Sequence, residues 1–388
     1  MAQTFQAVLQ ERIAAAFAAT GIELPEGFAP QVVPAADARH GDYQCNEAMG
    51  LAKRLRMNPR EVAAQVIAHL DVAGLAAPPE IAGPGFINLR LLPEALGARL
   101  RELLGDERLG VAETAEPKTV VIDFSAPNVA KPMHVGHIRS TIIGDCLARV
   151  ARFLGHRVIT DNHIGDWGTQ FGMVIYGWKH HLDRAGLEAD PIKELVRVYK
   201  HVNGLQKEDA AIADACREEL VKLQGGDGEN LGIWRQCVDL SLRELRAIYA
   251  RLGVEFDHYL GESFYNEALA PLVDKLIADG LARESDGAIC VFFDGHPDLD
   301  GKPCLIRKSD GGFLYATTDL ATIEHRVGEF AADEIWYVVG APQQLHFQQL
   351  FEIAARRGIG AKLVHIPFGS IRDPTASSCG PARAKASA

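Results

Sequence analysis

The sequence predicts an α/β protein in which a parallel sheet, covered by helices, carries a helical insertion and follows a small α+β domain. An apolar strand, a helix and a second strand succeed one another over residues 119–161, which is a βαβ pattern. Two further apolar strands at 334–339 and 362–366 flank another helical pattern, and the segment 180–260 is charged and helical. This alternation predicts a Rossmann-type sheet over residues 113–371.

Residues 1–112 have the pattern of a separate small domain. Apolar residues recur at helical spacing in three segments, and a turn followed by a strand comes after them: 5–20, 45–55, 59–70 and 78–92. A polar stretch that contains Glu113 and Pro117 then interrupts the pattern. We therefore place a domain boundary near residue 113.

The first strand of the βαβ pattern is Thr119–Phe124, whose β-branched apolar residues suit burial on both faces of a sheet. A loop over residues 125–133 leads to a helix that begins around His134, has apolar residues on adjacent helical rows, and ends at Gly155. The next strand covers Arg157–Thr160, so we expect the two strands to be parallel.

Charge and composition limit the function classes. The chain of 388 residues has 40 Lys and Arg against 51 Asp and Glu, a net charge of −11, which argues against a surface that coats nucleic acid but allows a local basic patch. Its seven cysteines never form a Cys-x-x-Cys pair, which favours reduced thiols and gives no zinc framework. No apolar run approaches the ~20 residues of a membrane span and the first residues lack a signal-peptide pattern, so we expect a cytoplasmic protein without membrane contact.

Two histidines follow the first strand of the βαβ pattern, in the sequence His134-Val135-Gly136-His137. Ligands bind at this carboxyl edge of open parallel sheets. Imidazoles on the first helical turn, with Gly136 allowing close backbone approach, would face a phosphate that the free N–H groups and the helix dipole already favour. A metal site would need a third ligand, and two surface histidines at a helix start are the plain structural interpretation.

Four longer motifs resemble arginyl-tRNA synthetases, which are class I aminoacyl-tRNA synthetases. They are Ser125–Thr141, which contains the His-x-Gly-His signature, Asp161–Gly172, Tyr315–Ala321 and Tyr337–His346. The resemblance covers residues 1 to about 371. It implies ATP-dependent activation of L-arginine to arginyl-adenylate, followed by transfer to tRNA(Arg).

The resemblance also implies an arginine-binding set, which comprises Asp123, Asn128, His134, Tyr315, Asp319 and Gln343. A planar guanidinium with five donors favours a carboxylate acceptor, here Asp319, and neutral groups that select against the ammonium of lysine. Tyr315 and Asp319 are four residues apart and can share one helical face. On structural grounds alone, Asp123 could hydrogen-bond the loop and Tyr315 could border the core.

The implied ATP-binding set comprises Pro127, Asn128, Lys131, His134, Gly136 and His137. Of these, Lys131, His134 and His137 are expected to be catalytic because they would stabilise the triphosphate as the carboxylate of arginine attacks the α-phosphorus. Mg²⁺ is implied with the nucleotide, without protein ligands that the sequence identifies. His163 is an expected lid or adenosine contact.

In the N-terminal domain the resemblance implies contacts to tRNA from Asp42, Tyr43, Gln44 and Asn46. Local positive charge comes from Lys53, Arg54, Arg56 and Arg60. Phosphate contacts of this kind position a nucleic acid rather than specify its sequence. A solvated helix face would show the same pattern.

The resemblance stops after Ile371. In the family the chain continues into a Lys-x-x-Lys-Thr-Arg-type loop and a helical anticodon-binding domain, which we expect to be absent here. Residues 372–388 are predicted to be an aberrant, disordered tail from a frameshift, and the chain an incomplete, inactive and monomeric form. Two alternatives stay open: a fragment that binds ligands without catalysis, and a class I-like nucleotidyltransferase that does not use tRNA.

Overall fold

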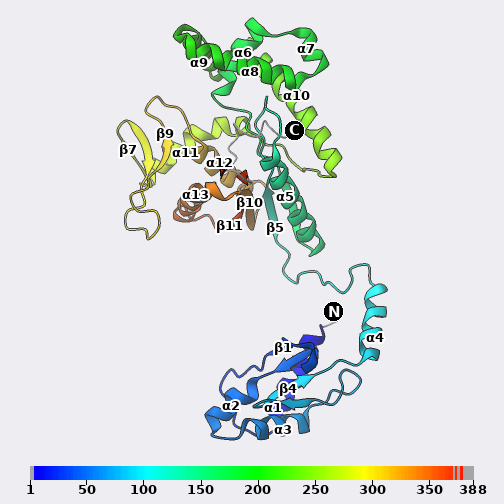
Figure 1. Ribbon diagram of the computed structural model, residues 1–388. Helices are drawn as coiled ribbons and strands as arrows, with labels where there is room; N and C mark the ends of the chain where they lie inside the picture. Colours follow the sequence, from blue (N-terminus) through cyan, green and yellow to red (C-terminus); the bar gives the residue numbers. More distant parts are fainter. Residues whose placement is uncertain (1–3, 370–371, 374–375, 379–388) are drawn as a thin grey trace. The chain divides into compact units, whose positions relative to one another are not determined.

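The computed structural model describes residues 4–369, 372–373 and 376–378 (Figure 1). It divides into two compact units, residues 1–112 and 113–388. Each unit has its own buried core. The two units are therefore described separately.

The N-terminal unit packs three helices against an antiparallel sheet of order β1-β2-β4-β3. Its elements are α1 (Phe5–Ala19), β1 (Val32–Pro34), η1 (Ala38–His40), β2 (Tyr43–Cys45), α2 (Glu47–Leu55), α3 (Pro59–His69), β3 (Glu80–Ala82), β4 (Phe86–Leu89) and α4 (Pro93–Leu104). Asn58 caps α3 through a 2.9 Å bond from the Arg60 N–H, and Pro59 occupies the first helical position. Gly85 has φ +139° and a Cβ there would lie 2.9 Å from the Pro59 carbonyl oxygen, so the turn before β4 requires glycine.

The second unit is built on a four-stranded parallel sheet of order β11-β10-β5-β6. The strands are β5 (Thr119–Asp123), β6 (Arg157–Asp161), β10 (Glu334–Gly340) and β11 (Lys362–Phe368). Helices of this unit are α5 (Val135–Phe153), α6 (Gln170–His181), α7 (Arg184–Ala189), α8 (Pro191–Glu208), α9 (Ala210–Gln224), α10 (Gly228–Leu252), η2 (Glu262–Tyr265), α11 (Asn266–Ala278), α12 (Tyr315–Gly328), η3 (Ala341–Gln343) and α13 (Gln344–Arg356). Strands β7 (Ala282–Ser285), β8 (Ala288–Val291) and β9 (Cys304–Arg307) form a separate antiparallel sheet.

The two faces of the parallel sheet bury different helices. Along β5, Val120 and Ile122 join a core with α5 and α10, whereas Val121 joins a core with α11, α12 and α13. Gly144 lets α5 lie directly on the sheet, because a Cβ at this position would be 2.1 Å from the Phe124 ring. Helices α6, α8, α9 and α10 form their own bundle in Figure 1, with a separate apolar core.

The predicted fold class is confirmed, including the parallel sheet, the helical insertion and the small α+β domain. The prediction of a helix from Cys45 was wrong at its start, because Cys45 ends β2 and α2 begins at Glu47. Within the predicted tail, β12 (Arg372–Asp373) pairs with β13 (Ala376–Ser378). The other residues of the tail lie outside the described residues. In the described part of the chain, no helix has both the length and the apolar character needed to cross a membrane.

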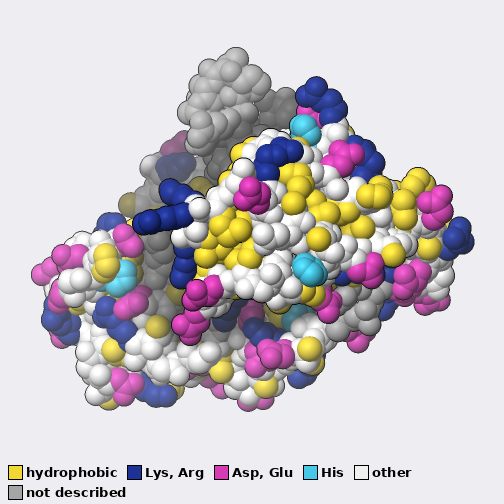
Figure 2. All heavy atoms as spheres, turned by 90° about the horizontal axis from the view of Figure 1, so that it is seen from below, with side chains coloured by type: hydrophobic (Ala, Val, Ile, Leu, Met, Phe, Trp, Pro, Cys, Tyr) yellow, Lys and Arg dark blue, Asp and Glu magenta, His cyan; other side chains and the backbone are white. Residues whose placement is uncertain are grey.

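Hydrophobic side chains also reach the surface. Figure 2 shows one face on which they gather among acidic and basic side chains. In the N-terminal unit, α4 buries none of its residues and exposes Leu96, Leu100 and Leu104 along one stripe. In the second unit, α5 exposes Ile138 and Ile142 next to its first turn.

Candidate functional site

The site lies at the carboxyl edge of the parallel sheet, where the strand order reverses. The chain leaves β5 toward β6 on one side, and β10 pairs with β5 on the other side. The loop after β5 (residues 124–134, here the β5–α5 loop) and η3 after β10 therefore flank one switch point. Ligands of open α/β sheets bind at such a point.

The backbone of the β5–α5 loop is strained. Ser125, Ala126 and Ala130 have φ values of +75°, +46° and +59°, a region that residues with a Cβ rarely adopt. The loop is joined to the segment after β6, because the Val129 N–H donates to the Gly165 carbonyl at 3.0 Å. The first and second sequence motifs are thus one structural unit.

His134 and His137 close the first turn of α5. His134 is its N-cap and its Nδ1 accepts from the Gly136 N–H at 3.1 Å, while Nδ1 of His137 accepts from the His134 N–H at 3.2 Å. The two rings stack with centroids 3.8 Å apart. Burial, helped by the neighbouring His134, lowers the pKa of His137 to about 4.

These bonds fix the chemistry of the histidine pair. A ring nitrogen that accepts from a backbone N–H carries no proton, so in a neutral ring the proton is on Nε2. His137 is neutral at pH 7 because its pKa is about 4. At the positive end of the helix dipole, each ring can offer an Nε2–H donor to an anion.

The other predicted ATP-binding residues lie on the same loop. Asn128 is exposed and forms a bridge with Gly165, where a Cβ would be 2.3 Å from the amide oxygen of Asn128. Pro127 is buried and its carbonyl accepts from the Gly165 N–H at 3.1 Å. Lys131 holds its ammonium 5.4 Å from the ring centroid of Tyr199, on α8.

Three predicted arginine-binding residues lie on neighbouring elements. Tyr315 and Asp319 both lie on α12, one turn apart, and Tyr315 is 73% exposed. Gln343 is exposed at the end of η3. The half-buried carboxylate of Asp319 is 2.6 Å from Nε2 of His346, a contact that sequence reasoning did not assign.

Asp123, by contrast, already pairs with an internal arginine. Nη2 of Arg326 lies 2.7 Å from Asp123 and 2.8 Å from Asp161, at the ends of β5 and β6. Arg326 is completely buried, and Asp123 is 5% exposed. Burial raises the pKa of Asp123, and the charge of Arg326 opposes this rise.

A further acidic group lies near this edge. Burial raises the pKa of Glu262 to about 7, and His163 acts against this rise whereas Asp166 and Asp319 add to it. His163 itself hydrogen-bonds the Leu260 carbonyl at 2.9 Å. Glu262 was not predicted from the sequence, because a single glutamate at the start of a short 3₁₀ turn belongs to no motif.

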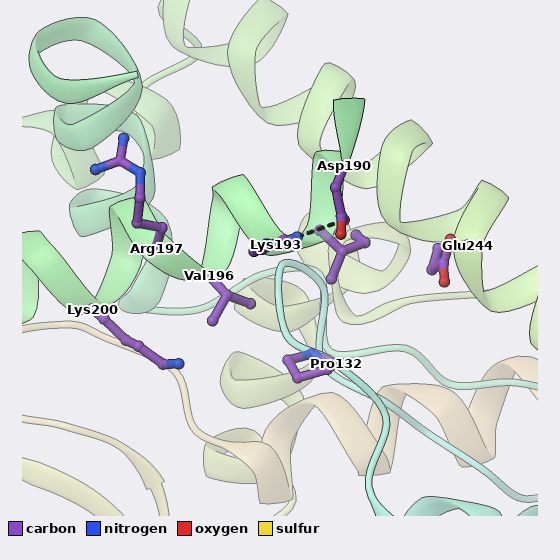
Figure 3. Close-up of a pocket in the computed structure, with 8 residues that line it drawn as sticks. Pro132, Asp190, Lys193, Val196, Arg197, Lys200 and Glu244 are labelled. Carbon is purple, nitrogen blue, oxygen red and sulfur yellow. Dashed lines mark hydrogen bonds between the residues drawn. The ribbon is translucent and has the colours of Figure 1, made fainter. Parts of the chain in front are cut away.

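Beside the β5–α5 loop, a hollow of about 580 Å³ opens toward the helical bundle (Figure 3). It is lined by Pro132 of the loop, by Glu244 of α10 and by residues at the start of α8: Asp190, Ile192, Lys193, Val196, Arg197 and Lys200. Arg197 is engaged by Glu194 at 2.6 Å. Lys193 and Lys200 are cationic and Asp190 and Glu244 are anionic, so the hollow has mixed charge next to the predicted ATP loop.

The predicted tRNA-binding residues of the N-terminal unit surround β2. Asp42 accepts from the Leu91 N–H at 2.7 Å, and the Gln44 side chain donates to Asn88 at 2.8 Å. Tyr43 is half-buried, and the buried side-chain oxygen of Asn46 has no hydrogen-bond partner among the described residues. The predicted basic residues all have exposed side chains: Lys53, Arg54, Arg56 and Arg60.

No group of three or more His, Cys, Asp and Glu side chains suited to a metal occurs in the described ranges. The imidazole and amide N–H groups at the start of α5 are hydrogen-bond donors and offer no ligand to a cation, so at this point the phosphates of a nucleotide would have to supply the ligands of Mg²⁺.

A strained loop and a histidine-capped helix at the switch point of a parallel sheet define a Rossmann-type α/β domain, a class of fold that binds its ligands at this point. The family model "tRNA synthetases class I (R), catalytic domain" matches residues 99–377, and "Arginyl tRNA synthetase N terminal domain" matches residues 7–91. The chain belongs to the arginyl-tRNA synthetase family of the class I synthetases.

Known relatives agree with this assignment. The arginine–tRNA ligases of Rhodopirellula baltica and Cellvibrio japonicus are 42% and 46% identical, over 90% and 94% of this chain. The chain spans 64% of the length of both relatives. The arginyl-tRNA synthetase of Plasmodium falciparum superimposes with a TM-score of 0.73 and 27% identity, covering 94% of this chain and 65% of that one. The Thermus thermophilus enzyme, with a TM-score of 0.70 and 22% identity over 97% of this chain and 68% of its own, has the same fold.

Proposed function

We propose that this chain carries the arginine-activating site of an arginine–tRNA ligase. ATP would bind with its phosphates at the start of α5, and L-arginine with its guanidinium toward Asp319. The observation that carries the proposal is the pair His134 and His137, whose Nδ1 atoms accept backbone N–H bonds and leave Nε2–H donors at a switch-point helix.

The activation step follows from this placement. A carboxylate oxygen of arginine attacks the α-phosphorus of ATP, the bond from this phosphorus to the bridging oxygen breaks, and pyrophosphate leaves with its electron pair. Negative charge grows on the phosphate oxygens in the transition state, so Nε2–H donors from His134 and His137 and the ammonium of Lys131 would stabilise it. In the second step a ribose hydroxyl of tRNA(Arg) attacks the carbonyl carbon of the adenylate and AMP leaves.

Selection of arginine would rest on Asp319, with Tyr315 and Gln343 beside it. The 2.6 Å contact with His346 orients the carboxylate of Asp319. A fixed carboxylate can accept two parallel N–H bonds from a guanidinium, which an ammonium cannot supply. Asn128 would contact the α-amino or carboxyl end of arginine, because it lies on the loop that also carries His134. Asp123 remains a predicted contact to the substrate.

In the N-terminal unit, Asp42, Tyr43, Gln44 and Asn46 remain predicted contacts to tRNA. The exposed arginines on α2 and α3 would add nonspecific attraction to phosphates. Mg²⁺ would accompany ATP and neutralise its phosphates. A monomeric protein in the cytoplasm is part of the same proposal.

Calorimetry and pyrophosphate exchange test the proposal on the purified chain. ATP and arginine should bind and lysine should not, and any exchange of labelled pyrophosphate into ATP should depend on arginine, measured with and without tRNA(Arg). Binding without exchange under both conditions would favour the fragment that binds ligands without catalysis. If a carboxylic acid other than arginine supports the exchange equally well, the nucleotidyltransferase alternative would be favoured. Absence of ATP binding would refute the proposal.

A further inference from the structure

The β5–α5 loop needs an external support for its backbone. Three of its non-glycine residues, Ser125, Ala126 and Ala130, are in the left-handed region. Such a backbone conformation is strained and persists only where its surroundings hold it. Part of this support comes from α5, where Oγ of Ser140 accepts from the Ser125 N–H at 3.0 Å, and part comes from α10, a helix more than a hundred residues further along the chain.

Tyr249 of α10 supports the beginning of the loop. Its hydroxyl lies 2.7 Å from Oγ of Ser125 and accepts from Nδ2 of Asn162 at 2.9 Å. The side-chain oxygen of Asn162 in turn accepts from the Ala126 N–H at 3.1 Å. Tyr249 is 1% exposed and Asn162 is completely buried, so water does not compete for these bonds.

Thr141 extends this network to the first turn of α5. Its Oγ1 lies 2.7 Å from the His137 carbonyl oxygen, which only accepts, and 2.8 Å from Oγ of Ser125, which Tyr249 also contacts. The chain of contacts therefore runs from Asn162 through Tyr249, Ser125 and Thr141 to the carbonyl of His137, within the first turn of α5.

Ser241, also on α10, supports the middle of the loop. Its Oγ accepts from the Ala130 N–H at 3.0 Å and donates to the Cys237 carbonyl at 2.8 Å. Val129 and Ala130 are buried in the apolar core of the helical bundle. Ser241 and Tyr249 are eight residues apart, about 12 Å along the helix, so one helix holds two separate points of the loop.

We propose that Tyr249 and Ser241 are positioning residues, through which α10 sets the conformation of the β5–α5 loop and hence the placement of its histidine pair. The consequence for ligands rests on the proposed function, in which this loop binds the phosphates of ATP. The effect on the conformation of the loop does not depend on the proposed function, because it concerns hydrogen bonds within the chain. Since α10 also belongs to the helical bundle, the bundle helps to build the nucleotide site.

Amide hydrogen exchange with single-residue resolution tests the conformational part. Tyr249→Phe should speed exchange of the Ala126 amide roughly tenfold, and Ser241→Ala should do the same for the Ala130 amide, because each variant removes one support. Ser241→Thr, which keeps the hydroxyl, should restore protection of Ala130. Tyr176→Phe, on α6, is the matched control and should leave both amides unchanged.

The pattern of exchange decides the outcome. Unchanged exchange of both amides, or equal acceleration throughout β5 and the loop with a lowered Tm, would overturn the proposal. Calorimetry with ATP then tests the link to function, and both variants should bind about fivefold more weakly than the unmodified chain. Equal affinities would overturn the role in placing the histidines. If the unmodified chain binds no ATP, the proposed function fails, whereas the exchange data still decide whether α10 holds the loop.

Discussion

Acid should destabilise the second unit partly through one imidazole, that of His137. Its pKa in the folded protein is about 4, against an ordinary value of 6.5, because of burial and then the neighbouring His134. Between these pH values the unfolded chain binds a proton at His137 that the native state does not bind. Stability is therefore complete above pH 6.5 and is lost as the pH falls toward 4.

The two pKa values give the size of the effect. At pH 5 the unfolded imidazole is almost fully protonated and the folded one is not, which corresponds to a loss of about 2 kcal/mol relative to pH 7. His137→Asn removes the titration, and the Asn oxygen can still accept the N–H bond of His134. The variant should lose about 2 kcal/mol less than the unmodified chain between pH 7 and 5.

Urea unfolding followed by tryptophan fluorescence measures this difference. All four tryptophans, at positions 167, 178, 234 and 336, lie in the second unit, so the signal reports this unit alone. His69→Asn, in the N-terminal unit, is the control and should leave the pH dependence of the transition unchanged. Equal losses in the unmodified chain and in His137→Asn would show that His137 is not shielded from protons, and the argument for a neutral phosphate donor would fall with it.

Three further predictions concern the pocket and the helix that carries the histidines. Asp319→Asn should weaken arginine binding by about 1.5–3 kcal/mol in calorimetry, because one charged acceptor for the guanidinium is lost; an unchanged Kd would remove Asp319 from the pocket. Lys131→Ala should slow adenylate formation far more than it weakens arginine binding, and equal losses would assign Lys131 to arginine binding instead. Gly144→Ala should destabilise the second unit by about 1–3 kcal/mol in urea, since its Cβ would be 2.1 Å from the Phe124 ring. The control Gly232→Ala has open space on α10 and should stabilise it by about 0.5–1 kcal/mol; similar results for both glycines would contradict the packing argument.

Local patterns of apolar residues were sufficient to predict the parallel sheet. Strand β5 is a run of β-branched apolar residues, and α5 follows with clear helical spacing, so their order alone specifies a βαβ unit. The antiparallel sheet of β7, β8 and β9 was missed. Its strands are four residues long and β7, Ala282–Ser285, has two exposed charged residues in the middle, which gives no strand signal.

The site could be predicted only where its residues form a contiguous motif. His134 and His137 both lie in the first turn of α5, and Tyr315 and Asp319 are one turn apart on α12. Tyr249 meets the loop across 124 residues of sequence, and no local period records such a contact. A serine in a charged helix is usually a surface residue. Only the fold brings Ser241 and Tyr249 of α10 to the β5–α5 loop.

Arg326 is the residue for which sequence reasoning fails most completely. It lies near the end of α12, where a cation is expected to face solvent and interact with the helix dipole. Instead it is completely buried between Asp123 and Asp161, with its guanidinium 5.5 Å from the ring centroid of Tyr337. Burial would lower the pKa of Arg326, but the two carboxylates raise it above its ordinary value.

Removing this charge should therefore cost more than removing an exposed ion pair. Arg326→Met leaves Asp123 and Asp161 buried without a cation, and the expected loss of stability of the second unit is about 3–5 kcal/mol. Adding Asp161→Asn to Arg326→Met removes one of the uncompensated charges and should recover at least about 1 kcal/mol. Urea unfolding followed by tryptophan fluorescence measures both. If Arg326→Met changes the stability by less than about 0.5 kcal/mol, or if the second substitution adds to the loss, the arginine is not what holds the two carboxylates at the strand ends.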